Sequence, residues 1–139
     1  MAYSDFTLAD LEEKFGVKNL RRQLFVQIDP VAPSEKLRLD LAESEEMLLR
    51  SEKARSEWIV VPILKELRQR NHKFLTIYSG ENLTADKEKG LVGECDFIIA
   101  RDTQSYDISW PLFMLVEAKK NDLEEGVRQC AAQMVGARV

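Results

Sequence analysis

The sequence of 139 residues predicts one α/β domain whose core, residues 51–139, is a three-stranded meander between two helices. Apolar residues recur at three- and four-residue steps in residues 51–70 and again in residues 122–137, which is the pattern of an amphipathic helix. Three apolar segments separated by polar, turn-rich connections lie between these helices and are typical of strands: residues 74–79, 91–100 and 112–119. The core order is therefore helix, three strands, helix.

The first fifty residues predict an N-terminal elaboration with helical and strand elements. Residues 7–15 begin with a capping threonine and are followed by Gly16, as a short helix should be. Residues 22–28, Arg-Gln-Leu-Phe-Val-Gln-Ile, favour a strand. Residues 34–41 begin with a capping serine and predict a second helix.

Several features of the core refine this prediction. Pro62 removes a backbone donor inside the first core helix and is expected to bend or break it. Residues 80–90 are charged and predict a connection, not a strand. Residues 112–119 are apolar on both faces until their end, as expected of a central strand. Asp122 is placed to cap the last helix.

Bulk properties exclude several classes of protein. No apolar stretch approaches the roughly 20 residues of a membrane span, and the first residues lack the basic start and apolar run of a signal peptide, so we expect a cytoplasmic protein without a membrane partner. His72 is the only histidine, which excludes a histidine-based triad. Cys95 and Cys130 form no CxxC pair and are expected to be reduced thiols. The net charge of −4 neither favours nor excludes nucleic acid as a partner.

Two acidic residues interrupt strands that are otherwise hydrophobic. Asp96 lies in the second predicted strand and Glu117 near the end of the third, with Lys119 two residues further on the same face. A carboxylate in an apolar strand indicates a metal, a cation or a strand end at the surface, and hard oxygen ligands suit Mg²⁺ or Mn²⁺. If the two strands pair, Asp96, Glu117 and Lys119 form a set suited to metal-dependent hydrolysis of a phosphodiester.

Asp96 and the triplet Glu117-Ala118-Lys119, between apolar strands and ahead of a helix, resemble the PD-(D/E)XK superfamily of restriction-endonuclease-like nucleases. The resemblance covers about residues 51–139 and implies a restriction-endonuclease-like core. Within the superfamily, the sequence is similar to the nuclease domains of type I restriction subunits. The further residues that carry this similarity are Lys120, Gly126, Gln129 and Ala131. Two positions depart from the family: Cys95 replaces a frequent proline, and Gln133 stands where a tyrosine is common.

The resemblance also implies two further site residues. Gln129, on the helix after the lysine, would assist catalysis, although Gln133 lies one turn away and is an alternative. A glutamate on the first core helix would complete the metal ligands. Glu57 is predicted there, because it shares a helical face with Val61 and Leu64, while Glu52 and Glu66 are the alternatives. The predicted metal ligands are thus Asp96, Glu117 and Glu57.

The resemblance implies a Mg²⁺-dependent endonuclease that hydrolyses DNA with metal-activated water. Two alternatives stay open: a non-catalytic binding module that retains the fold, and a subunit of a larger complex. The basic run Lys65, Arg68, Arg70 and Lys73 is interpreted as an exposed helix face that complements the helix dipole, with a phosphate-contacting patch as the alternative.

The chain ends at Val139, directly after the last predicted helix, whereas the family core continues into a further strand. Residues 112–116 would then form an open apolar sheet edge, which favours association. We therefore expect either a longer natural protein or another chain, such as a second copy or a member of a larger complex, that covers this edge.

Overall fold

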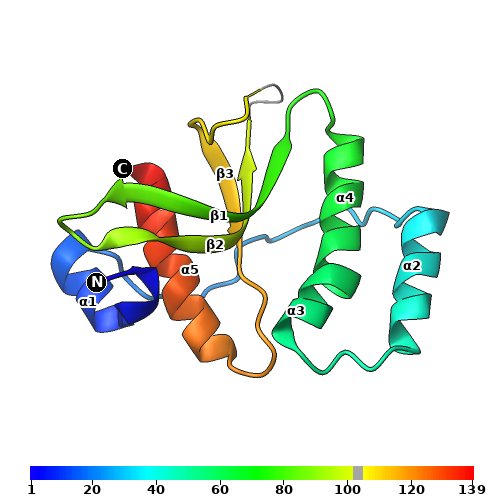
Figure 1. Ribbon diagram of the computed structural model, residues 1–139, viewed down its shortest axis with the longest axis horizontal. Coiled ribbons are helices and arrows are strands. Elements are labelled where there is room, and N and C mark those ends of the chain that lie inside the picture. The colour runs from blue at the N-terminus through cyan, green and yellow to red at the C-terminus, as the bar shows by residue number, and fades with distance from the viewer. Residues whose placement is uncertain (102–104) are drawn as a thin grey trace.

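The computed structural model describes residues 1–101 and 105–139 and has a three-stranded antiparallel sheet at its centre. The strands β1 (Thr76–Asp86), β2 (Leu91–Ala100) and β3 (Leu112–Val116) follow one another in the order β1-β2-β3. Figure 1 shows α5 (Leu123–Arg138) on one side of the sheet and α4 (Val61–Arg70) on the other, with α2 (Glu35–Glu45) outside α4. The predicted α/β class and the three-stranded meander are confirmed.

The first hairpin is longer than the sequence predicted. Residues 80–90 were expected to be a connection, but β1 continues through Asp86 and pairs with β2 nearly to its end. Gly80 adopts a left-handed φ of 65° in the middle of the strand, which lets the long hairpin bend (Figure 1). Beyond this bend Leu83 is buried while its neighbours are exposed, so one apolar face is enough to hold a strand that reads as polar.

β3 is shorter than predicted and lies at an edge of the sheet. It ends at Val116 and not at Lys119, because the next free amide, that of Ala118, donates to the Asp96 side chain at 2.7 Å. Among the described residues β3 pairs only with β2, so the expectation of a central strand is wrong for this structure. Phe113 is 55% and Met114 49% exposed.

Pro62 does not break the first core helix. The helix runs from α3 (Glu52–Arg55) through a π-helical turn, η2 (Ser56–Val60), into α4. In a regular helix the amide of residue 62 would donate to the Trp58 carbonyl, and proline has no such donor. The Ser44 hydroxyl of α2 lies 2.7 Å from that carbonyl oxygen and supplies the missing donor. The proline therefore couples this helix to α2 without ending it.

The N-terminal residues belong to the main core. A short 3₁₀ turn, η1 (Tyr3–Asp5), and α1 (Leu8–Phe15) place Tyr3, Phe6 and Leu11 against α5 and the sheet. The predicted caps are confirmed: Thr7 accepts a hydrogen bond from the Asp10 amide, Ser34 caps α2, and Gly16 is left-handed.

The strand predicted at residues 22–28 is absent, and this prediction is wrong. The segment is irregular, with bends at Leu24 and Val26, whose side chains are 85% and 95% exposed. A high β propensity needs a partner strand, and none of the described strands pairs with this segment.

The hydrophobic core has two parts, one on each side of the sheet. The larger part lies between the sheet, α5 and the N-terminal residues. The smaller part lies between the sheet and α4 and includes Leu64, Phe97 and Ile99. No described helix has the length and apolar character to cross a bilayer.

Candidate active site

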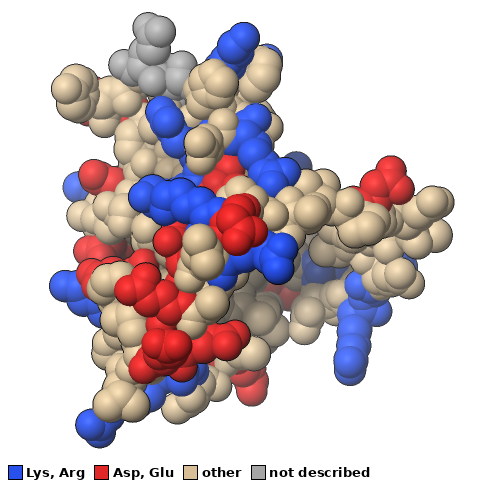
Figure 2. Space-filling model, turned by 90° about the vertical axis from the view of Figure 1, so that its right-hand side faces the viewer, with Lys and Arg blue, Asp and Glu red and all other residues tan. Residues whose placement is uncertain are grey.

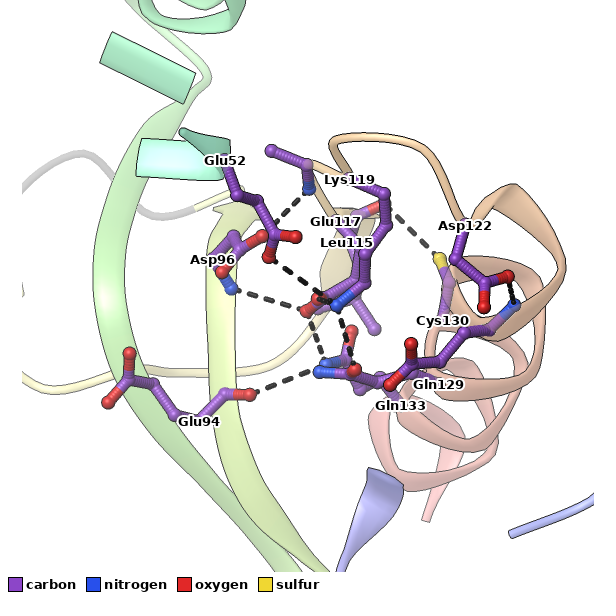
Figure 3. A network of polar contacts seen from close by, with 12 residues as sticks. Glu52, Glu94, Asp96, Leu115, Glu117, Lys119, Asp122, Gln129, Cys130 and Gln133 are labelled. Carbon is purple, nitrogen blue, oxygen red and sulfur yellow. Dashed lines mark hydrogen bonds and ion pairs between the residues drawn. The ribbon is translucent and has the colours of Figure 1, made fainter. Parts of the chain in front are cut away.

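The middle of β2 and the residues that follow β3 bring Asp96 and Glu117 together. The amide of Asp96 donates to Glu117 Oε1 at 3.3 Å, and Asp96 Oδ2 accepts from the Ala118 amide at 2.7 Å. Each carboxylate is thus held by the backbone of the other strand (Figure 3). These reciprocal bonds replace the regular ladder beyond Phe97↔Val116, the last pair between the two strands.

Lys119 places its ammonium group among three side-chain oxygens. Its Nζ lies 3.2 Å from Gln129 Oε1, 3.6 Å from Glu52 Oε1 and 3.9 Å from Glu117 Oε2. The lysine side chain is only 13% exposed, so these contacts are screened less than those of a surface pair. Figure 3 shows Glu52, Glu117 and Gln129 pointing toward it from three different elements.

Gly126 makes room for the lysine stem on α5. A Cβ at this position would lie 2.8 Å from Lys119 Cγ, closer than packed side chains allow. Glycine inside a helix is unfavourable by roughly 0.5–1 kcal/mol relative to alanine, so its presence here has a local reason. The reason is the close passage of Lys119 over the helix.

Glu117 is the most buried of the charged residues in this cluster. Its side chain is 3% exposed, and burial raises the pKa of its carboxyl above the ordinary value. The hydrogen bond from Gln133, the Asp96 amide and the nearby Lys119 lower this pKa, and the negative charge of Asp96 raises it further. Glu117 Oε2 accepts no hydrogen bond from the described residues. This oxygen and Gln133 Oε1 are the two buried acceptors of the cluster that lack a donor among the described residues.

Glu52, and not Glu57, is the helix glutamate at the site. Glu57 is 54% exposed, pairs with Lys53 at 3.9 Å and lines a hollow of about 580 Å³ between α2 and α4. The structure does not bring it to the other predicted ligands, and this part of the predicted site needs correction. Glu52 is one of the two alternatives that the sequence offers, and the other, Glu66, instead accepts from the Ser34 amide at 3.1 Å.

Arg55 fixes the helix that carries Glu52. Its Nε donates to the Leu49 carbonyl at 3.2 Å, and its Nη1 donates to the carbonyl of Lys120. The second bond joins α3 to the residue that follows Lys119. The sequence offers no signal for this residue beyond its charge, because both of its partners are backbone oxygens of distant segments.

The two glutamines of α5 have different roles. Gln129 contacts Lys119, as predicted, whereas Gln133 donates through Nε2 to Glu117 Oε1 and to the Glu94 carbonyl. Gln133 is fully buried and is the only donating side chain on Glu117 Oε1 among the described residues. The sequence predicts it only as a substitute for Gln129, because the spacing of one helical turn does not distinguish the two contacts.

The donor set suits a hard cation held by few protein ligands. Asp96 and Glu117 supply carboxylate oxygens. Glu117 Oε2 accepts no hydrogen bond from the described residues, so a cation could bind it without displacing a donor. Across residues 1–101 and 105–139, no three His, Cys, Asp or Glu side chains gather closely enough to hold a metal ion. Mg²⁺ commonly uses one or two carboxylates together with water and substrate phosphate, so a two-carboxylate site fits it.

Comparisons with models of protein families, with curated proteins and with solved structures found no match.

Proposed function

We propose that this chain is a restriction-endonuclease-like, Mg²⁺-dependent nuclease that hydrolyses phosphodiester bonds of DNA. The observation that carries the proposal is the placement of Lys119, a mostly buried cation 3.9 Å from Glu117 and next to the Asp96–Glu117 pair. Two carboxylates and one ammonium group beside two paired strands match the needs of phosphodiester hydrolysis: anionic ligands for a cation, and a positive charge for the phosphate.

In this proposal each side chain has one task. Asp96 and Glu117 would hold Mg²⁺, which when bound supplies water activation and neutralises charge on the phosphate. Lys119 would donate to a phosphate oxygen or orient the attacking water, and Gln129 holds its ammonium group in place at 3.2 Å. Glu52 forms an ion pair with the same ammonium group at 3.6 Å and would keep it directed toward the carboxylates.

A non-catalytic module is the second candidate, and a specific observation favours it. Glu117 Oε1 already accepts from Gln133 and from the Asp96 amide, and Asp96 Oδ2 accepts from the Ala118 amide. A network that satisfies most of its own acceptors can serve to join β2, β3 and α5 without any metal. Metal binding separates the two candidates.

The test is calorimetric titration of Mg²⁺ or Mn²⁺ into the wild type and Asp96→Asn, followed by incubation of both with linear and supercoiled DNA. The asparagine side chain keeps an oxygen for the Ala118 amide but removes the charge, so the fold should survive. We expect the variant to lose metal binding and cleavage together. Lys119→Ala should bind metal and fail to cleave. A wild type that binds no metal and cuts no DNA would leave the non-catalytic module as the function.

Glu52 and Glu57 offer a matched pair of controls. Glu52 precedes η2 and Glu57 lies in it, and their side chains are 46% and 54% exposed. Substitution of either by glutamine should therefore perturb folding equally little. Glu52→Gln should lower the cleavage rate by about ten-fold, since Lys119 loses a charged partner. Glu57→Gln should cleave like the wild type. Equal effects of the two variants would show that the Glu52–Lys119 pair has no part in the reaction.

A further inference from the structure

A second hollow lies on the other side of α4 from α2. It encloses about 470 Å³ between α4 and the start of β1, within the roughly 300–1,000 Å³ typical of ligand sites. Lys65 and Arg68 of α4 and the Ser79 hydroxyl of β1 form its polar rim, over an apolar floor that includes Leu64, Ile77 and Phe97. No acidic side chain of the described residues lines it. The hollow is therefore cationic and open to an anion.

Lys65 and Arg68 are not neutralised by neighbouring carboxylates. No ion pair formed by the described residues includes either side chain, and both are exposed. Other cations nearby are paired: Lys36 with Asp40 at 2.7 Å and Arg70 with Glu66 at 3.4 Å. Figure 2 shows the face that carries α2 and α4, on which Lys and Arg side chains gather above a group of Asp and Glu side chains. Lys65 and Arg68 also line the hollow between α2 and α4, where they form no ion pair with its acidic residues among the described part of the chain.

The floor of this hollow includes Phe97, the neighbour of Asp96 in the chain. Phe97 directly follows Asp96 on β2 and pairs with Ser79 of β1 on one side and with Val116 of β3 on the other. Val116 directly precedes Glu117 and packs in the same apolar cluster as Phe97. The hollow and the two carboxylates therefore involve consecutive residues of the chain, whose side chains alternate between the faces of the sheet.

We propose that this hollow binds a backbone phosphate of a nucleic acid strand, an inference that rests on the proposed function. Lys65 and Arg68 lie three residues apart on one face of α4, so both can reach one phosphate group or two successive ones. The hydroxyl of Ser79 adds a donor, and the apolar floor accepts the sugar. Phosphate contacts of this kind set the register of a strand without reading its sequence.

The test measures binding of a short fluorescein-labelled oligonucleotide, single-stranded and duplex, by anisotropy in EDTA, where no cleavage occurs. The variant Lys65→Ala/Arg68→Ala should bind at least about ten-fold more weakly at low salt. The slope of log K against log salt should fall by about 1.4 for a single strand or about 1.8 for a duplex, as expected for two lost phosphate contacts. The matched control is Lys36→Ala/Arg38→Ala on α2, which removes the same charge from paired positions and should change neither affinity nor slope.

Each outcome separates this inference from the proposed function. If the double variant binds and cuts like the wild type, the hollow has no role and the inference fails, while the nuclease stands. If the wild type binds, the double variant does not, and neither cuts in Mg²⁺, the hollow is a nucleic-acid site and the nuclease proposal fails. A wild type that does not bind the oligonucleotide, or binds poly-glutamate equally tightly through Lys65 and Arg68, overturns the assignment to nucleic acid.

Discussion

Replacing Ser44 by alanine should remove the donor that compensates for Pro62 in the first core helix. The Ser44 hydroxyl lies 2.7 Å from the Trp58 carbonyl oxygen and 2.9 Å from that of Asp40, but it has a single proton to donate. The Asp40 carbonyl lies inside α2, where the amide four residues on is its ordinary partner. The hydroxyl proton therefore belongs to the Trp58 carbonyl.

The expected cost follows from the burial of this contact. A buried acceptor that loses its donor costs about 1–3 kcal/mol. Ser44 is 5% exposed, but the Trp58 residue is 45% exposed, so water partly replaces the hydroxyl and the lower half of that range applies. We expect Ser44→Ala to lower the free energy of unfolding by about 1–2 kcal/mol. For a chain of this size the melting temperature should fall by about 4–8 °C.

A double-mutant cycle with Pro62→Ala tests the reason and not only the size. Alanine at 62 restores an amide donor for the Trp58 carbonyl, so the cost of Ser44→Ala should shrink by at least about 0.5 kcal/mol in that background. Urea denaturation of the four proteins, followed by circular dichroism, measures the coupling. Ser4→Ala, at an exposed position, is the control and should stay within about 0.5 kcal/mol of the wild type. The same cost with and without Pro62 would refute the proposed compensation.

Three further predictions concern the site and its surroundings. Gly126→Ala should reduce cleavage by at least about ten-fold by displacing the stem of Lys119, without lowering helix stability. Gly136→Ala, whose Cβ would clash with the Tyr3 hydroxyl, should instead lower the free energy of unfolding by about 1–3 kcal/mol. Thermal melts and cleavage assays that showed the reverse pattern would contradict both assignments. Burial raises the pKa of Glu117, so above the ordinary glutamate pKa the folded state binds more protons than the unfolded state, and the wild type loses stability as pH rises from about 4.5. Glu117→Gln has no such group, so its free energy of unfolding minus that of the wild type should increase over the same pH range. A difference independent of pH in EDTA would contradict this. Burial raises the pKa of Cys95 to about 12, so this thiol should react with iodoacetamide at pH 8 far more slowly in native than in unfolded protein. For the same reason the free energy of unfolding should fall between about pH 9 and 12. Rapid labelling of the native protein would disprove the burial.

Much of the fold could be predicted because its elements carry their own boundaries. β2 has the bounds predicted for it, Leu91–Ala100, because a short apolar run between turn residues is typical of a buried strand. The helices α1 and α5 begin after their capping residues for the same local reason. The spacing of Glu117 and Lys119, and their expected approach to Asp96, followed from strand geometry once β2 and β3 were assumed to be neighbours.

What only the tertiary structure decided depends on contacts between segments distant in sequence. Residues 22–28 have a high β propensity but stay unpaired, and residues 81–86 read as polar yet form a strand, because a strand exists only where a partner offers its backbone. The choice of Glu52 over Glu57 has a similar origin. The prediction assumed a regular helix of 3.6 residues per turn, but the π-helical turn at Ser56–Val60 inserts a wider turn and rotates the preceding residues relative to Leu64. That turn is held by Ser44 on another helix, so the sequence of this helix alone does not determine which glutamate faces the site.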